Sequence, residues 1–399
     1  MSVSPLDIAA SATKTASSRQ ILVNRDMLCF SHDWNSDPLS KTHLMRLLAQ
    51  NNRILWVNSI GYRAPTVSTR DIKRAWNKLI SMAYPLREVI PNLFVLNPFV
   101  IPAWGTDWAR RFNRRLLQVQ VKQAMRQLRF HKPINWIFNP AASVLAGELG
   151  EEQVIYYCVD EYTAFSGVPT QALIRMEQQL LERADVVLVS AEKLLHSKRP
   201  VARNIHLIRH GVDFDHFHRA VLPETSVAEE LVNLPKPVLG YFGLLSQDWV
   251  DVLLLEKVAE RYSSGSLVLI GKVAMDLGKL PARKNVHILG RKPYSSLPRY
   301  CKGFDVALIP FPISQVTLNA NPLKAREYLA AGLPTVSTAI PEVEVLGECY
   351  IGKCHEDFLV QLDDALRKPG PDRSRSERMR SESWSSRLND IRRCLATIT

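Results

Sequence analysis

The chain lacks the segments that define several common protein classes. No stretch approaches the ~18 uninterrupted apolar residues of a membrane-spanning helix, and the first twenty residues contain no apolar core of the kind found in secretory signals. The six cysteines show no Cys-x-x-Cys spacing, which favours buried thiols in a reducing compartment over a redox motif or a disulfide framework. From the sequence we expect a cytoplasmic protein.

The glycine-rich turns of dinucleotide-binding enzymes are absent as well. No Gly-x-Gly occurs in the chain, which argues against NAD and FAD enzymes of the usual kind. Residues 347–354 nearly match a phosphate-binding P-loop, but Cys354 stands where a Ser or Thr would ligate magnesium. We interpret this segment as a chance match and expect no resident cofactor.

A group of histidines and aspartates suggests a metal site at first sight: His206, His210, Asp213, Asp215, His216 and His218. The first two lie four residues apart in a segment that we predict to be a strand, where that spacing amounts to roughly 13 Å. This distance is too long for two ligands of one ion. We interpret the segment as a turn and domain hinge and expect no metal.

What the chain does have is a series of short apolar segments, each long enough for a buried parallel strand and separated from the next by longer amphipathic stretches. This alternation predicts parallel sheets covered by helices on both faces. The segments are residues 27–32, 53–58, 92–97, 135–140, 154–159, 186–191 and 205–210 in the first half, and 238–243, 266–271, 286–290, 306–311 and 334–339 in the second.

A polar, proline-containing connection separates the two series, so we expect an α/β protein of two Rossmann-like, doubly wound domains facing a cleft. The expected boundaries are residues 25–212 and 213–366, after a flexible segment at 1–24. Residues 367–383 are rich in Ser and Arg and poor in apolar residues, which predicts a linker. Helical spacing resumes at residues 384–399.

The net charge of +12 is unevenly distributed. Residues 1–210 carry 27 Lys and Arg against 16 Asp and Glu, and residues 104–132 alone carry eight basic residues against one acidic residue. Such a stretch favours an anionic partner. Within it, Trp104, Trp108, Phe112, Leu116 and Val119 recur at helical spacing, which predicts either a helix lying on an anionic membrane or a surface helix with this stripe in the core.

The most informative segment is TLNANPLKAREYLAAGLPTVST, residues 317–338. With Asn321 as the N-cap, a helix is expected from about Pro322 until Gly332 ends it. Its N-terminus would lie where α/β sheets bind ligands and anions. Lys324 adds a positive charge there, and Glu327 could accept both hydroxyls of a ribose. Spacing alone also allows an exposed ion pair between these two residues.

Several motifs in order resemble one family. They are HGVDFDHF, LGYFG, LVLIGK, NVHILGRKPYSSLPRYCKGFDVALIPF and NPLKAREYLAAGLPTVST, and the N-terminal segments CFSHDWNSDPLSKTHLMRLLAQNNRILWVNSIGYR and YYCVDEYTAF fit as well. Over about residues 25–365 the chain resembles bacterial GT-B glycosyltransferases of the group-one type, in the branch that assembles teichuronic acid and exopolysaccharide.

The resemblance implies a nucleoside-diphosphate sugar in the second domain, with Glu327 on the ribose and Lys324 and the helix N-terminus on the diphosphate. It also implies that the last helix crosses back onto the first domain. The chain departs from the family at Asn319, where a Glu is usual, and after Gly243, where the usual Arg and Lys are absent. Lys272 or Arg291 would then supply further positive charge for the diphosphate. With Asn321, these are the expected donor-binding residues.

The acceptor side offers three candidate bases at the ends of predicted strands: Asp160, His32 and Asp33. The expected function is transfer of a sugar, most simply from a UDP-sugar and without a metal, to a hydroxyl of a saccharide or polyprenyl-linked acceptor. The expected place is the inner face of the plasma membrane. A nucleotide-sugar epimerase on the same scaffold and a non-catalytic basic module that binds nucleic acid are the alternatives. The basic stretch has few stacking aromatics, so we expect no nucleic acid.

Overall fold

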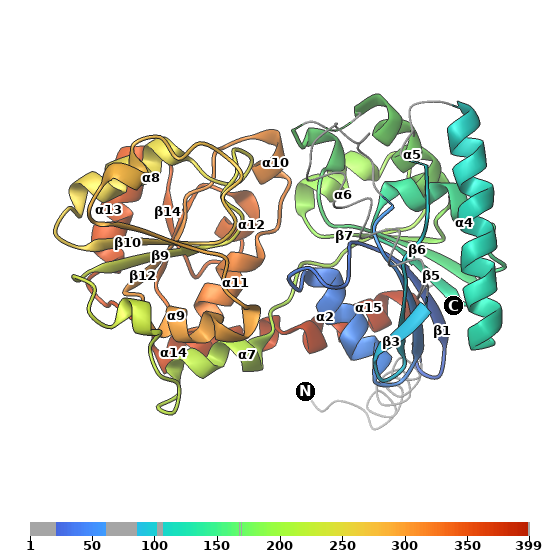
Figure 1. Ribbon diagram of the computed structural model, residues 1–399, viewed down its shortest axis with the longest axis horizontal. Helices are drawn as coiled ribbons and strands as arrows, with labels where there is room; N and C mark the ends of the chain where they lie inside the picture. The colour runs from blue at the N-terminus through green and yellow to red at the C-terminus, as the bar shows by residue number, and fades with distance from the viewer. Residues whose placement is uncertain (1–20, 61–85, 102–106, 167, 169, 398–399) are drawn as a thin grey trace, which may run out of the picture. The chain divides into compact units, whose positions relative to one another are not determined.

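The computed structural model describes residues 21–60, 86–101, 107–166, 168 and 170–397. Residues 1–20 of the expected flexible segment and residues 104–106 of the basic stretch, with Trp104, lie outside these described residues. The chain divides into two compact units; in Figure 1, unit 1 is mainly blue to green with a red C-terminal helix, and unit 2 runs from yellow-green to red. Unit 1 comprises residues 1–208 and 388–399, and unit 2 comprises residues 209–387.

Unit 1 is built on an eight-stranded sheet with the strand order β3-β4-β2-β1-β5-β6-β7-β8. Neighbouring strands are parallel except for β3 and β4, which pair antiparallel. The strands are β1 (Asp26–Phe30), β2 (Arg53–Val57), β3 (Leu86–Ile90), β4 (Leu93–Leu96), β5 (Ile134–Ile137), β6 (Gln153–Cys158), β7 (Val186–Val189) and β8 (Ile205–Leu207). The helices are α2 (Ser40–Ala49), α4 (Asp107–Leu128), α5 (Thr170–Arg183) and α6 (Glu192–Lys198), with 3-10 turns at Pro140–Leu145 and Tyr162–Ala164.

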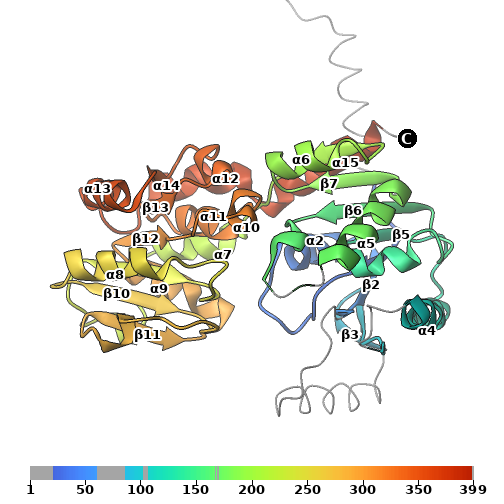
Figure 2. The same cartoon turned by 90° about the horizontal axis from the view of Figure 1, so that it is seen from above.

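Alternate residues of each strand supply two cores, one on each face of the sheet. In β1, Leu28 and Phe30 pack into the core beneath α4, α5 and α6, whereas Met27 and Cys29 pack into the core beneath α2. Figures 1 and 2 show helices on both faces. The last helix, α15 (Trp384–Ala396), contributes three residues to the core beneath α2: Leu388, Ile391 and Leu395.

Unit 2 is built on a six-stranded parallel sheet with the order β11-β10-β9-β12-β13-β14. Its strands are β9 (Val238–Phe242), β10 (Ser266–Ile270), β11 (Val286–Gly290), β12 (Val306–Ile309), β13 (Thr335–Thr338) and β14 (Tyr350–Gly352). Its helices are α7 (Phe214–His218), α8 (Val252–Arg261), α9 (Leu297–Gly303), α10 (Gln315–Leu318), α11 (Leu323–Ala330), α12 (Pro341–Glu344), α13 (His355–Ala365) and α14 (Arg373–Arg378). Short 3-10 turns lie at Arg219–Val221, Glu229–Leu231, Leu280–Ala282, Tyr294–Ser296 and Met379–Glu382.

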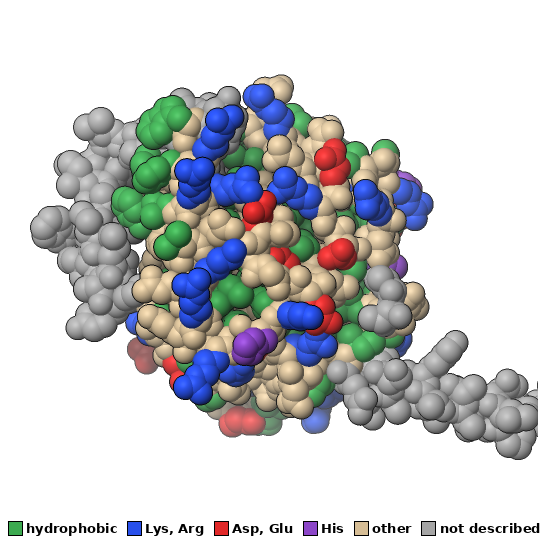
Figure 3. Space-filling view, turned by 90° about the vertical axis from the view of Figure 1, so that its right-hand side faces the viewer, with side chains coloured by type: hydrophobic (Ala, Val, Ile, Leu, Met, Phe, Trp, Pro, Cys, Tyr) green, Lys and Arg blue, Asp and Glu red, His purple; other side chains and the backbone are tan. Residues whose placement is uncertain are grey.

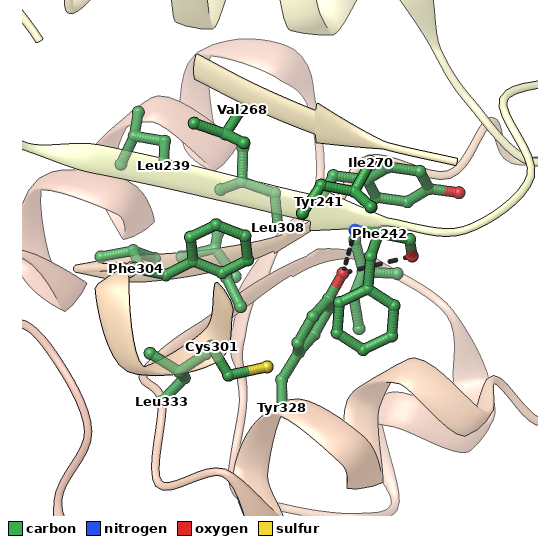
Figure 4. Close-up of a cluster of buried hydrophobic side chains, with 14 of the residues drawn as sticks. Leu239, Tyr241, Phe242, Val268, Ile270, Cys301, Phe304, Leu308, Tyr328 and Leu333 are labelled. Atoms are coloured by element: carbon green, nitrogen blue, oxygen red, sulfur yellow. Dashed lines mark hydrogen bonds between the residues drawn. The ribbon is translucent and has the colours of Figure 1, made fainter. Parts of the chain in front are cut away.

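Tyr328 attaches α11 to the central strand of unit 2. Its hydroxyl accepts a hydrogen bond from the backbone N–H of Phe242 at 2.8 Å, and the two rings meet edge to face at 4.6 Å. Figure 4 shows this contact within the buried cluster. Nearby, the Phe304 ring covers Gly240, where a Cβ would come within 2.2 Å of the ring. The first turns of α11 are therefore fixed against the carboxyl end of β9.

All twelve predicted strands are present, and the α/β fold class is confirmed. Two boundaries differ from the prediction. Unit 2 begins at residue 209 instead of 213. The expected linker, 367–383, instead folds into α14 and the turn Met379–Glu382 within unit 2. Hydrogen bonds compensate for its low apolar content, since Ser376 donates to the carbonyl of Ala330 and Met379 is buried.

Candidate active site

The carboxyl ends of neighbouring unit 2 strands bring two glycine loops together. The N–H of Gly243, which follows β9, donates to the carbonyl of Ile270 at 2.8 Å. Gly271, which follows β10, lies so close that a Cβ there would fall 1.7 Å from the Gly243 carbonyl oxygen. This edge of a parallel sheet is where α/β folds place ligands, and the absence of a side chain at Gly243 and at Gly271 lets the two loops approach each other closely.

Helix α11 begins next to these loops, one residue later than the sequence predicted. Pro322, not Asn321, is its N-cap, and the first helical residue is Leu323. The Asn321 side chain cannot cap the helix because it is used elsewhere: it accepts a bond from Arg326 at 2.6 Å and lies 3.3 Å from a carboxylate oxygen of Glu342. The helix ends before Gly332, which has φ +78°, as the sequence predicted.

Lys324, in the first turn of α11, extends over Gly243. A Cβ added to Gly243 would lie 2.1 Å from Lys324 Cε, so only glycine leaves room for the lysine. The ammonium lies 5.8 Å from the ring centre of Tyr241 and 5.9 Å from that of Phe311. Burial lowers the pKa of Lys324, and Glu327 opposes that effect. A cation is thus held at a helix N-terminus and beside the backbone of Gly243, which together can bind an anion.

Glu327 lies one turn further along α11 and is buried. Burial raises the pKa of its carboxyl group to about 7; Lys324 opposes this rise and Asp213 adds to it. The carboxyl group is therefore poised between its charged and neutral forms near neutral pH. Two hydroxyl groups donating to it would favour the charged form, which suits a ligand that carries a diol.

Sequence reasoning missed Arg326, the buried centre of an ionic network in unit 2. Its Nε donates to the carboxylate of Glu382 at 3.0 Å, and its Nη1 donates to the side-chain oxygen of Asn321 at 2.6 Å. Glu382 also accepts from Arg387. These bonds join α11 to residues 382–387, at the end of unit 2. Nothing in the sequence around Arg326 indicates that this helical arginine pairs with Glu382, far along the chain.

The network continues through Glu342, which accepts from Arg209 at 2.7 Å. His210 Nδ1 lies 2.8 Å from the Asn321 carbonyl oxygen. The backbone N–H of Val212 donates to the backbone carbonyl of Glu382, and the Val212 carbonyl accepts from the backbone N–H of Trp384. The two ends of unit 2, 209–212 and 382–387, are thus paired with each other and attached to α11.

The other expected donor residues lie at the same sheet edge with different surroundings. Lys272 is exposed, and its carbonyl accepts from Leu245 at 3.0 Å, next to the Gly243 loop. Arg291 follows β11, two strands from β9 in the sheet order, which corresponds to roughly 10 Å. Asn319 donates to the Gln315 carbonyl of its own helix at 2.7 Å. The structure therefore brings Lys324, Glu327 and Gly243 together, with Lys272 adjacent.

In unit 1, the expected bases lie at the carboxyl ends of β6 and β1, with β5 between them. Burial raises the pKa of Asp160 to about 6, and the ammonium of Lys41 opposes this rise. Lys41, in the first turn of α2, is a residue that sequence reasoning missed. Its position is informative only once the ends of β1 and β6 are known to be close. A carboxylate with this pKa can accept a proton near neutral pH.

His32 and Asp33 are less suited to that role. Burial and, to a smaller extent, the ammonium of Lys41 lower the pKa of His32 to about 3, so the ring is neutral and weakly basic. The ring contacts Ser31 at 3.1 Å and Thr42 at 3.4 Å. Asp33 is exposed, and its carboxylate accepts from the N–H of Ser59 at 3.2 Å.

A second ionic network holds the loop after β6 in place. Lys198 donates to Glu161 at 2.8 Å and to Glu177 at 2.7 Å, and Glu177 also accepts from Tyr156 at 2.7 Å. Glu161 follows Asp160 directly. The bond between Lys198 and Glu161 therefore holds in place the loop that carries the candidate base, Asp160.

The histidines that suggested a metal site have separate partners. His206 contacts Asn204 at 2.7 Å, His216 stacks on Tyr294 at 4.4 Å and His218 contacts Ser376 at 2.8 Å. Within residues 21–60, 86–101, 107–166 and 170–397, no group of three or more metal-ligating side chains is found. In the same part of the chain no helix is long and apolar enough to cross a membrane.

The amino-acid sequence matches known proteins over part of its length. Residues 236–367 match the family described as glycosyl transferases group 1. Over 284 residues the chain is 23% identical to TuaH of Bacillus subtilis (strain 168), which is named as a teichuronic acid biosynthesis glycosyltransferase. The match covers 64% of this chain and 70% of the relative.

Two solved structures share the fold. Sucrose-phosphate synthase from Thermosynechococcus elongatus superposes with a TM-score of 0.68 at 13% identity and covers 94% of this chain and all of that one. HepE of Anabaena, in complex with UDP-glucose, superposes with a TM-score of 0.64 at 13% identity and with the same coverage. At this identity the likeness concerns the fold.

Proposed function

Because this chain is a group-one glycosyltransferase with the GT-B fold, we propose that it transfers a sugar from a UDP-sugar to a hydroxyl of a saccharide acceptor. The acceptor is carried on a lipid and is an intermediate in the assembly of a cell-surface polysaccharide. The observation that carries the proposal is the joint position of Lys324 and Glu327 on α11 above the Gly243 loop.

The donor residues have distinct roles in this proposal. Glu327 accepts hydrogen bonds from the two ribose hydroxyls, and the charged form that accepts them is accessible because its pKa is about 7. Lys324 and the N-terminus of α11 contact the diphosphate. When the bond between the sugar and the diphosphate breaks, negative charge develops on the leaving group, and fixed positive groups stabilise it without a metal ion.

Asp160 is the proposed base of the acceptor side. A hydroxyl that attacks the donor sugar in an inverting reaction loses its proton to a group within about 3 Å. The raised pKa of Asp160 suits it to hold that proton, whereas His32 is too weak a base at a pKa of about 3.

The donor site is tested by measuring the affinity for UDP and for uridine by calorimetry. Glu327→Ala should weaken the binding of both, because both contain the ribose, and should lose roughly 2–4 kcal/mol of transition-state binding in transfer assays. Lys324→Ala should weaken UDP more than uridine. The exposed residues Glu344 and Lys353 of unit 2 provide matched Ala controls. Equal affinities of wild type and both variants would overturn the donor site.

The acceptor base is tested separately. Asp160→Asn keeps the shape and most hydrogen bonds but removes the base, so turnover should fall about a hundredfold or more while UDP affinity is unchanged. Near-normal turnover of Asp160→Asn would refute this role. A nucleotide-sugar panel, followed by protection against thermal unfolding, identifies the donor. Conversion of one nucleotide sugar into another without an acceptor would identify an epimerase instead.

A further inference from the structure

Helix α4 packs on unit 1 through a face that the sequence analysis did not single out. Leu117, Val121 and Ala124 of this 22-residue helix are buried in the core beneath it. The predicted apolar stripe is therefore not the core-facing side. The helix is already held in place by these three residues, and its other faces are free of that task.

The predicted stripe is largely exposed. Trp108, Phe112 and Val119 are 62%, 48% and 63% exposed. At about 100° per residue, these three lie within about 40° of one another and nearly opposite Leu117. They extend over roughly 16 Å along the helix axis. Large apolar side chains in a line on the outside of a helix are costly to leave in water.

Basic residues lie beside this strip. At the same angular spacing Arg111, Arg115, Lys122 and Arg126 fall within about 60° of Trp108. Among the described residues no salt bridge involves these four, whereas Arg114, further round the helix, pairs with Glu148. No residue between 108 and 128 is acidic. Figure 3 views the side of the molecule that bears α4 and shows Lys and Arg side chains beside hydrophobic ones.

We propose that the α4 outer face is a docking surface for an anionic lipid membrane; it comprises Trp108, Phe112, Val119, Arg111, Arg115, Lys122 and Arg126. A straight apolar strip bordered along one side by cations matches a plane that is apolar inside and negatively charged at its surface. A nucleic acid fits less well, because Val119 offers no ring for base stacking. The assignment of this docking surface depends on the exposure and charge of its residues. Its purpose, which is access to a lipid-linked acceptor, rests on the proposed function.

The test is co-sedimentation of the full chain with vesicles of phosphatidylglycerol and phosphatidylcholine, compared with vesicles of phosphatidylcholine alone. Wild type should bind the anionic vesicles at least tenfold more tightly. Each basic residue near an anionic surface contributes about fivefold, so Arg115→Gln/Lys122→Gln/Arg126→Gln should weaken binding about a hundredfold. Trp108→Ser/Phe112→Ser should remove the binding that persists at high salt, because salt screens only the charges.

The matched control is Lys279→Gln/Lys284→Gln/Lys353→Gln, which removes three exposed lysines from unit 2 and should leave vesicle binding unchanged. Lys122 is partly buried and the other substituted side chains are exposed, so thermal unfolding should stay close to that of the wild type. Binding that is absent, equal on neutral vesicles, unaffected by both α4 variants or equally reduced by the control overturns the proposal. So does retention of RNA, and not of vesicles, by the α4 outer face.

UDP affinity, measured on the same proteins, separates this inference from the proposed function. It should be the same in the wild type and in both α4 variants. Vesicle binding without any UDP binding would refute the proposed donor site and leave the docking surface standing. UDP binding and transfer to a soluble acceptor without vesicle binding would refute the docking surface and leave the proposed donor site standing.

Discussion

Replacing Arg326 by Met tests whether the buried ionic network stabilises unit 2. Methionine fills a similar volume but makes neither the bond to Glu382 nor the bond to Asn321. Removing one partner of a buried ion pair costs about 3–5 kcal/mol. Here Glu382 is 24% exposed and keeps Arg387 as a partner, so we place the loss at the lower end, about 3 kcal/mol.

For a unit the size of residues 209–387, such a loss lowers the midpoint of thermal unfolding by roughly 6–12 °C. Scanning calorimetry of the full chain measures it. The matched control is Arg378→Met, because the pair of Arg378 with Glu348 is largely exposed, with 51% of the arginine side chain accessible. Such exposed pairs contribute about 0–1 kcal/mol.

A second measurement asks whether the loss comes from the pair itself. In a cycle with Glu382→Gln, the double variant should lose less than the sum of the single losses, because the second change removes a carboxylate whose partner has already gone. UDP affinity should also fall in Arg326→Met, since Asn321 directly precedes Pro322, the N-cap of α11. Additive losses in the cycle, or a midpoint shift no larger than that of Arg378→Met, would refute the reasoning.

Three further predictions concern the sites of both units. Lys198→Met should cost about 3–5 kcal/mol at neutral pH, because Glu161 and Glu177 remain buried without their cation. Lys198 lowers the pKa of Glu161. The stabilisation of the folded state by this ion pair is therefore present above the ordinary carboxyl pKa and is lost as pH falls. If urea unfolding shows that the variant loses the same free energy of unfolding at neutral and at acid pH, this prediction is contradicted. The pH profile of kcat/KM should rise through about pH 6, the pKa of Asp160, and Lys41→Met should move that midpoint upward because it removes the charge that lowers the pKa; an unmoved midpoint in rate measurements would count against Asp160. Gly243→Ala should displace Lys324 and weaken UDP about tenfold or more by calorimetry, a loss on the order of 1.4 kcal/mol, whereas Gly290→Ala, with positive φ but open space around it, should not; equal affinities would show that the lysine does not act on the ligand from this position.

Most strands of the fold could be predicted from the sequence because buried parallel strands appear as continuous runs of apolar residues. The two strands that the sequence analysis missed lack such runs. β3 is a half-exposed, antiparallel edge strand with Arg87 and Glu88 at its centre, and β14 has only three residues. The error at residues 367–383 has a different cause. That segment is held by hydrogen bonds such as those of Ser376, and a count of apolar residues does not register them.

The candidate site was predictable where local chemistry specifies it. Lys324 and Glu327 follow a helix start that the Pro and Gly positions mark. Asn321 illustrates the limit: its type suits an N-cap, but Arg326 and Glu342 engage its side chain and Pro322 takes the cap position. Lys41 could not be predicted, because its relation to Asp160 exists only once strands distant in sequence are adjacent.

The division of the chain has a consequence for its synthesis. Unit 1 is discontinuous: its last residues, including Leu388, Ile391 and Leu395 of α15, are made only after all of unit 2. On the ribosome, domains usually fold in the order in which they emerge. Unit 2 is contiguous and can close its core as soon as residue 387 has left the tunnel. Unit 1 begins first, but the core beneath α2 lacks its last three residues throughout that time, and it is the N-terminal unit that is completed last.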